Sequence, residues 1–388
     1  MPSFLRLRAR HYATNELLDV EVENGAIARI EAAGNGQCTH QAHVIAPAYF
    51  DLQINGGHGI GFTSAELTVD RVRQVVANCH RHGIAALCPT VVTNSYEVLY
   101  HSLSVLRMAA DQADLARALP CIHLEGPYIA AEDGPRGAHP RAFVRPPDEQ
   151  EFLRLQDASC GRIGLLTLAP ELDGALPFIE NRVKQNVVVS IGHSNASPRQ
   201  IRDAVNAGAR LSTHLGNGCA RTLPRHENLL WEQLAADELS ASLITDGFHL
   251  PWSLVRCFIR MKGAQRIILT SDASEMAGLS PGRYGQWAQE VEVLPEGKIV
   301  LCGQGVLAGS WAFTDLCLSR LVQQQFVTVS DAIDMASVNP RRLLSLGVQS
   351  LEVGQPADLV LLNRAADGSL CLAGTIVAGT FHSPAEAT

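Results

Sequence analysis

Four short polar segments of the sequence carry side chains that can bind metal ions or move protons, and each directly follows or ends a short apolar stretch. A single histidine in such a place is more often a hydrogen-bonded core or loop residue than a ligand. Four such segments at the ends of successive parallel strands would, however, meet at one face of a sheet. The segments are His123-Leu124-Glu125-Gly126-Pro127, Gly192-His193-Ser194-Asn195, Thr213-His214-Leu215 and Ser271-Asp272-Ala273.

Three of these residues, Glu125, His193 and His214, form a ligand set for a metal ion. A carboxylate and two neutral imidazoles suit Zn2+ and leave a further position for water. The metal lowers the pKa of that water, and a nearby carboxylate can deprotonate it and pass the proton to a leaving amine. We predict that Asp272 is this carboxylate, and the alternative is that it caps a helix N-terminus. His123 is expected nearby, where it could orient a ligand.

The segments need a scaffold that brings strand ends together, and the middle of the chain provides the pattern for one. Between about residues 45 and 346, short apolar stretches alternate with amphipathic helical segments, which is typical of repeated β-α units. Eight such units favour a (β/α)8 TIM-like barrel over an open sheet, and in these barrels the chemistry lies at the carboxyl ends of the strands. The strand candidates are residues 50–54, 85–88, 121–124, 163–168, 187–191, 210–213, 242–244 and 267–270.

Both ends of the chain differ from the middle. Residues 4–44 contain short strand-like stretches separated by turn signals, and residues 357–362 and 375–379 are strand-like as well. We therefore expect the two ends to join in a small β-sandwich domain. The predicted division is residues 1–45 plus 347–388 for this small domain and residues 46–346 for the barrel.

Composition narrows the class of protein further. A chain of 388 residues that is 46% apolar can bury one large core with an appendage. The net charge of -8 disfavours binding to nucleic acid or to an anionic membrane surface, while a small anionic ligand stays possible. Ten scattered cysteines without a C-x-x-C pair indicate reduced thiols, and there is no signal-peptide or membrane-span pattern. We expect a cytoplasmic protein.

With these residues in view, the sequence resembles the N-acetylglucosamine-6-phosphate deacetylase family, a branch of the amidohydrolase superfamily, along nearly its whole length. The resemblance implies a metal-dependent hydrolase that removes the N-acetyl group of an amino sugar, with N-acetylglucosamine 6-phosphate the leading substrate. The matching segments are residues 46–56, 123–127, 137–140, 168–171, 192–196, 213–215, 246–249, 271–273 and 309–310.

The resemblance also implies the number of metal ions. Most amidohydrolases place a His-x-His pair after the first strand, whereas this chain has Gln53 and Asn55 there, which are poor metal ligands. Members of the deacetylase family with Gln and Asn at these positions are associated with a single metal. The expected cofactor is therefore one divalent ion per subunit, most simply Zn2+, bound by Glu125, His193 and His214.

Other family roles transfer to matching residues of this chain. Asp272 matches the catalytic aspartate, and His139 matches a histidine near the substrate. The histidine of the family's D-G-x-H segment, near the sugar and its phosphate, corresponds to His249. Arg225 follows Asn217 by eight residues, as does the family's phosphate-binding arginine, which reaches across from the partner subunit. The resemblance thus implies a homodimer. The remaining expected substrate contacts are Asn217, Gly218, Gly309 and Ser310.

The departures from the family concentrate around the sugar and its phosphate. Gly216 replaces an aromatic residue, Gly218-Cys219 replaces Ala-Met, the loop at residues 221–231 is unusual, and residues 131–136 form a slightly longer insert. An altered pocket changes specificity more readily than reaction type. Two alternatives therefore stay open: an amidohydrolase for a non-phosphorylated amino sugar or another N-acyl substrate, and a non-catalytic barrel.

Overall fold

The computed structural model describes residues 4–34, 36–286, 289–347 and 349–385, and its centre is a barrel of eight parallel strands. The strands neighbour one another in chain order, and a bridge between Ile54 and Ala273 closes the sheet between its two edges. All eight predicted strands and the (β/α)8 fold class are confirmed. The strands are β5 (Tyr49–Ile54), β8 (Ile84–Val92), β9 (Ile122–Glu125), β10 (Ile163–Leu168), β11 (Val188–Ile191), β12 (Leu211–Ser212), β13 (Ser240–Leu243) and β14 (Ile267–Leu269).

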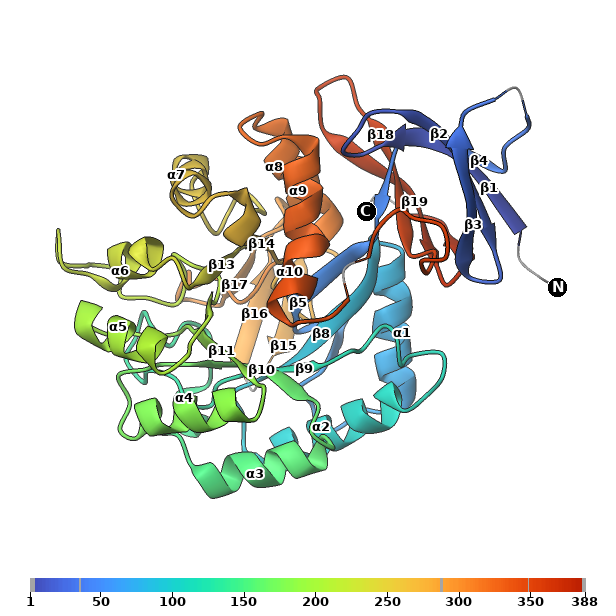
Figure 1. The fold of residues 1–388 in the computed structure, drawn as a ribbon. Coiled ribbons are helices and arrows are strands. Elements are labelled where there is room, and N and C mark those ends of the chain that lie inside the picture. The colour runs from blue at the N-terminus through green and yellow to red at the C-terminus, as the bar shows by residue number, and fades with distance from the viewer. Residues whose placement is uncertain (1–3, 35, 287–288, 348, 386–388) are drawn as a thin grey trace.

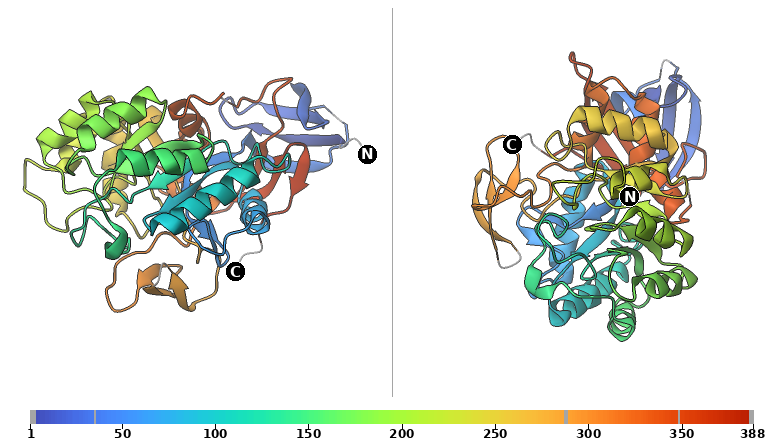
Figure 2. Two further views of the ribbon diagram at one scale, coloured as in Figure 1. Left: turned by 90° about the horizontal axis from the view of Figure 1, so that it is seen from below. Right: turned by 90° about the vertical axis from the view of Figure 1, so that its left-hand side faces the viewer.

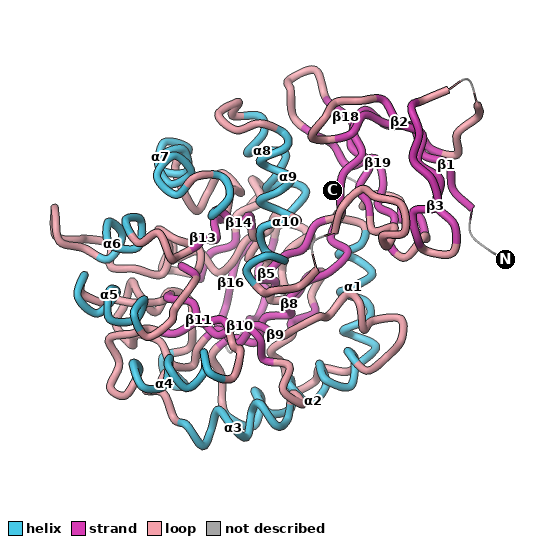
Figure 3. Tube along the Cα trace, viewed as in Figure 1, coloured by secondary structure: helices cyan, strands magenta, loops and turns pink. Residues whose placement is uncertain are grey.

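Helices surround the strands, as Figures 1 and 3 show. Several begin at a side chain that caps their free backbone N–H groups, such as Ser197, which forms a capping box with Gln200. Their apolar faces pack on the outside of the barrel in one large core. The helices are α1 (Val69–His80), α2 (Tyr96–Ala110), α3 (Glu149–Ala158), α4 (Ala175–Lys184), α5 (Pro198–Asn206), α6 (Leu229–Ala235), α7 (Trp252–Lys262), α8 (Thr314–Gln323), α9 (Val329–Ala336) and α10 (Val338–Leu343).

The inside of the barrel is divided into an apolar and a polar layer. Phe50, Leu52, Cys88 and Leu165 belong to a second core cluster, which residues after α9 help to cover. The polar strand-end residues occupy the opposite end. Below them, the buried Asp51 accepts hydrogen bonds from the Thr270 and Thr314 hydroxyls and from two backbone N–H groups, which fixes the seam where β5 meets β14. The apolar layer therefore gives the site a rigid floor.

A separate seven-stranded sheet joins the two ends of the chain, and Figure 1 shows it beside the barrel. Its central contact is the antiparallel pairing of β4 with β18, and its two halves enclose their own apolar core. This confirms a small β domain built from both termini, while its boundaries at residues 45 and 346 stay a prediction. The strands are β1 (Phe4–His11), β2 (Leu17–Glu23), β3 (Ala26–Ala32), β4 (His40–Pro47), β18 (Leu359–Arg364), β19 (Leu370–Val377) and β20 (Thr380–His382).

A three-stranded antiparallel sheet, which the sequence pattern did not predict, is inserted after β14. It consists of β15 (Gly282–Gln286), β16 (Gln289–Val293) and β17 (Ile299–Leu301), and Figure 2 shows it projecting from one side of the barrel. Its apolar side packs on Ala138 and Met276. Elsewhere, Gly56–Gly57 (β6) and Ile60–Gly61 (β7) form a small hairpin. No helix in the described part of the chain is long and apolar enough to cross a membrane.

Candidate active site

The predicted metal ligands meet at the carboxyl ends of three strands. Glu125 is the last residue of β9, and His193 and His214 follow β11 and β12. Both histidines have positive φ angles, +50° and +30°, which turn the chain sharply at the strand ends. Glu125 Oε1, His193 Nε2 and His214 Nε2 form a triangle with all three sides 3.1 Å long. No other group of three possible metal ligands comes together in this way among the residues that the structure describes.

The donor set fits a divalent cation. His193 Nδ1 lies 2.9 Å from the Pro135 carbonyl oxygen, so this nitrogen carries the hydrogen and Nε2 presents a lone pair. That lone pair faces a carboxylate oxygen and a second imidazole nitrogen, all buried. Three electron-rich atoms this close are stabilised by a positive charge between them.

Asp272 lies beside this triangle, held by two side-chain amides. Its Oδ1 accepts hydrogen bonds from Gln53 Nε2 at 3.0 Å and from Asn55 Nδ2 at 2.8 Å. The Gln53 amide also donates to Glu125 Oε1 at 2.9 Å, so one side chain links both carboxylates. Burial, followed by the charge of Glu125, raises the pKa of Asp272 to about 6. The N-cap alternative fails, because a bridged residue and a turn follow Asp272 and no helix begins there.

Gln53 and Asn55 were predicted from the sequence only to be poor metal ligands. Their amide groups do not replace the missing histidines, since both point N–H groups at a carboxylate. His123 lies deeper in the barrel, where its ring nitrogens contact the Leu52 carbonyl oxygen at 3.1 Å and the Thr167 hydroxyl at 2.7 Å. Burial lowers the pKa of His123 to about 4. It is therefore neutral and belongs to the polar layer of the barrel interior, next to Thr167.

Two further predicted histidines line the same pocket. His139 contacts the Thr93 hydroxyl through Nδ1 at 2.8 Å, and its Nε2 lies 3.2 Å from His193 Nε2. His249 Nδ1 lies 2.7 Å from Asp246 Oδ2. Burial of Asp246 opposes its ionisation, yet hydrogen bonding from His249 lowers its pKa to about 2. The ionised Asp246 therefore orients the His249 ring.

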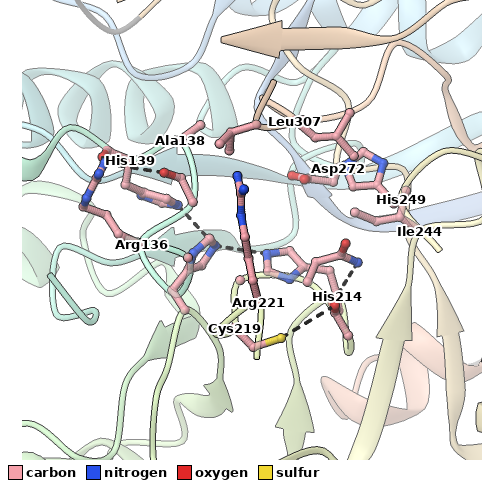
Figure 4. A pocket seen from close by; sticks show the side chains of 18 of the residues that line it. Arg136, Ala138, His139, His214, Cys219, Arg221, Ile244, His249, Asp272 and Leu307 are labelled. Carbon is pink, nitrogen blue, oxygen red and sulfur yellow. Dashed lines mark hydrogen bonds between the residues drawn. The ribbon is translucent and has the colours of Figure 1, made fainter. Parts of the chain in front are cut away.

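These side chains surround a cavity of about 1070 Å³ (Figure 4). Of the predicted substrate contacts, Asn217, Gly218 and Gly309 line it together with His139 and His249. Ser310 is not among the lining residues, and its buried hydroxyl lies 3.3 Å from Asp246 Oδ2. Arg225 is exposed outside the cavity of its own chain.

Two arginines that were not predicted as site residues, Arg136 and Arg221, line the cavity. Both belong to segments in which the chain departs from its family, the insert at residues 131–136 and the loop at residues 221–231. Their location in these two segments was the one sequence feature that could have pointed to them, because nothing in either arginine's immediate neighbours marks it as a binding residue.

The glycines of the loop after His214 fit their surroundings closely. A Cβ on Gly216 would lie 2.8 Å from the Leu250 side chain, and its φ is +94°. A Cβ on Gly218 would lie 3.0 Å from the ring of His193, with φ at +56°. Larger residues would strain the backbone at both positions, and at position 218 they would press on the predicted metal ligand His193. Glycine at positions 216 and 218, where the family usually has other residues, therefore fits the packing of this pocket.

Comparisons with known proteins agree with this geometry. The model of the amidohydrolase family matches residues 266–381. The N-acetylgalactosamine-6-phosphate deacetylase of Escherichia coli O157:H7 is 32% identical over 92% of this chain and 94% of its own. The mouse N-acetylglucosamine-6-phosphate deacetylase is 33% identical over 88% of this chain and 84% of its own.

A solved structure is similar as well, that of the Mycobacterium smegmatis N-acetyl-D-glucosamine-6-phosphate deacetylase in complex with N-acetyl-D-glucosamine-6-phosphate. The match has a TM-score of 0.87 at 30% identity, and it covers 98% of this chain and 99% of the other. The chain belongs to the N-acetylglucosamine-6-phosphate deacetylase family of amidohydrolases.

Proposed function

We propose that this protein hydrolyses the N-acetyl group of a phosphorylated amino sugar, with N-acetylglucosamine 6-phosphate the leading substrate and glucosamine 6-phosphate and acetate the products. The observation that carries the proposal is the meeting of Glu125, His193 and His214 with Asp272 in one cavity. A non-catalytic barrel has no need of this combination. The similarity to deacetylases over most of the chain supports the same reaction.

One divalent cation, most simply Zn2+, is the proposed cofactor. Glu125, His193 and His214 would hold it, and the amides of Gln53 and Asn55 are engaged with carboxylates. When bound, such an ion supplies Lewis-acid activation of water and of the amide carbonyl. A second ion would need ligands that these amides do not provide.

The chain's own residues account for the proton transfers. Asp272 presents Oδ2 to the pocket while Oδ1 is held by two amides, so Oδ2 is free to take a proton from the attacking water. Oxygen attacks the acetamide carbon, the C–N bond breaks, and Asp272 returns the proton to the leaving nitrogen. His139 and His249 are the candidate donors to the developing negative charge on the carbonyl oxygen.

The remaining assignments support substrate binding and assembly. Asn217, Gly218, Gly309 and Ser310 are proposed to hold the sugar, and His249 its phosphate. Arg225 is proposed to reach the phosphate in a neighbouring subunit of a homodimer, and its exposure on the surface of its own chain is compatible with that role. Ten free cysteines support a reducing, cytoplasmic location.

The test is acetate release from a panel of N-acetylated compounds by the metal-loaded protein. The panel contains N-acetylglucosamine and N-acetylgalactosamine, each with and without a 6-phosphate, and an N-acetyl amino acid. The galactosamine pair is included because one relative acts, by its name, on N-acetylgalactosamine 6-phosphate. We expect the highest kcat/KM with N-acetylglucosamine 6-phosphate. Activity only on an unphosphorylated sugar or the amino acid would refute the proposed substrate, and no acetate from any compound would refute the deacetylase.

A further inference from the structure

Arg221 places an uncompensated positive charge in the cavity. It lines the cavity near its mouth, and in the view of Figure 4 its guanidinium lies between His139 on one side and Asp272 on the other. Throughout the described part of the chain, this guanidinium has no hydrogen-bond or ion-pair partner. An arginine that projects into a binding cavity and contacts no carboxylate of its own chain is available to a ligand.

The neighbouring arginine is already engaged. Arg136 donates to Asp133 Oδ1 at 2.5 Å and to the His139 carbonyl oxygen at 2.7 Å. Its charge is therefore balanced, and its contacts hold the segment that carries His139. Of the three carboxylates that line the cavity, Asp133 is paired with Arg136, while Glu125 and Asp272 contact imidazoles and amides. Arg221 is thus the cavity cation that no described acidic side chain neutralises.

The position of Arg221 depends on the two segments in which this chain departs from its family. The insert at residues 131–136 packs on the loop that carries Arg221: a Cβ on Gly134 would lie 3.3 Å from the Cys219 carbonyl oxygen and 3.7 Å from the Arg221 nitrogen. The next insert residue, Pro135, accepts the hydrogen bond from the metal ligand His193. The insert therefore fixes the Arg221 loop relative to the metal site.

We propose that Arg221 binds the phosphate of the substrate within the same subunit, which deepens the proposed function and rests on it. A guanidinium pairs with a phosphomonoester through two parallel, charge-assisted hydrogen bonds. Because Arg221 is exposed at the cavity mouth, it meets the anion with little loss of hydration. Arg225, which is proposed to reach the phosphate from a neighbouring subunit, then contributes less than Arg221.

The test compares Arg221→Ala, Arg221→Lys and Arg225→Ala, with Arg199→Ala as the matched control because Arg199 is 86% exposed on α5, away from the cavity. Each metal-loaded variant is assayed with N-acetylglucosamine 6-phosphate and with N-acetylglucosamine. Loss of one charge-assisted pair predicts that Arg221→Ala lowers the kcat/KM ratio of phosphorylated to unphosphorylated sugar at least about tenfold, through KM. The lysine variant should fall between the parent and the alanine variant, and Arg225→Ala should change the ratio less than Arg221→Ala.

A second measurement separates this inference from the proposed function. Binding of inorganic phosphate to the metal-loaded parent and variants is measured by calorimetry, with the Tm of each variant recorded. If the parent releases no acetate from any sugar, the proposed function fails and the phosphate affinity still decides the role of Arg221. Weaker phosphate binding in Arg221→Ala than in Arg225→Ala supports the inference. Equal affinity and an unchanged sugar ratio in a folded Arg221→Ala protein, or a larger loss in Arg225→Ala, would overturn it.

Discussion

Replacing Asp272 by Asn separates the chemistry of this residue from its structural role. In the parent, Oδ1 accepts hydrogen bonds from Gln53 and Asn55, and Oδ2 has no hydrogen-bond partner among the described residues. The amide oxygen of an asparagine can accept the same two hydrogen bonds, which directs its NH2 group to the former place of Oδ2. The backbone contacts of residue 272 with Gln53 and Ser310 do not involve the side chain. The substitution should therefore keep the fold, the metal ligands and the shape of the cavity.

What the variant loses is basicity. A positioned general base contributes roughly 100-fold to 10,000-fold to the rate. We take the lower bound and expect kcat to fall at least about 100-fold, which corresponds to about 2.7 kcal/mol of lost transition-state stabilisation. KM and metal content should change little, because the substituted oxygen belongs to neither the metal triangle nor the phosphate contact.

The assay is acetate release under saturating substrate, with metal per chain measured by elemental analysis and folding by Tm. Asp70→Asn is the matched control, because its side chain is 84% exposed in the first turn of α1, away from the cavity. A metal-loaded Asp272→Asn protein within a few-fold of parental kcat would refute the base assignment and leave Asp272 a structural role at the β5–β14 seam. Loss of metal with activity would instead place Asp272 among the ligands.

Three further predictions test the metal site, its polar support and the small domain. His193→Ala and His214→Ala should each lose metal and activity. The parent should hold about one divalent ion per chain, lose activity when a chelator removes the ion, and regain activity with Zn2+. Elemental analysis measures the metal content, and acetate release measures the activity. Gln53→Leu removes the amide that links the two site carboxylates, so kcat should fall roughly tenfold or more while the metal is retained; full activity would show that the link is dispensable. In the small domain, hydrogen bonding from Arg8 keeps the pKa of the buried Asp19 well below its usual value. Asp19→Ala should cost roughly 3 kcal/mol of unfolding free energy at neutral pH. Because the folded-state pKa is depressed, this contribution is full above about pH 5 and declines as pH falls below about 4, so denaturant titrations of parent and variant should converge in acid.

The barrel could be predicted because its strands are short apolar stretches bounded by helices of clear periodicity. Such a pattern defines each β-α unit locally, and eight units in succession allow few other arrangements. The sheet of β15–β17 could not be predicted in the same way. Its apolar residues, such as Val291 and Ile299, pack against Ala138 and Met276, and Ala138 comes from a loop far away in the sequence. The stability of these strands depends on a surface that exists only once that loop is folded.

The metal triangle followed from topology, since the carboxyl ends of β9, β11 and β12 must lie close together in a closed barrel. The role of Gln53 did not follow. Its amide reaches Asp272 only because β5 and β14 meet at the closure of the barrel, although the two residues are 219 positions apart in the sequence. The residue type shows that an amide is a poor metal ligand, but it cannot show which carboxylate the amide will contact.

Arg221 illustrates the difference between catalytic groups, which the strands position, and substrate-binding groups, which the loops position. Strand ends fix the catalytic groups, so residues of the right type in the right order predict the reaction. The loops fix substrate recognition, and their course depends on local φ angles and on contacts between segments distant in sequence. Here the insert at residues 131–136 contacts both His193 and the loop that carries Arg221. A change in that insert would therefore move the proposed phosphate contact and the metal site together.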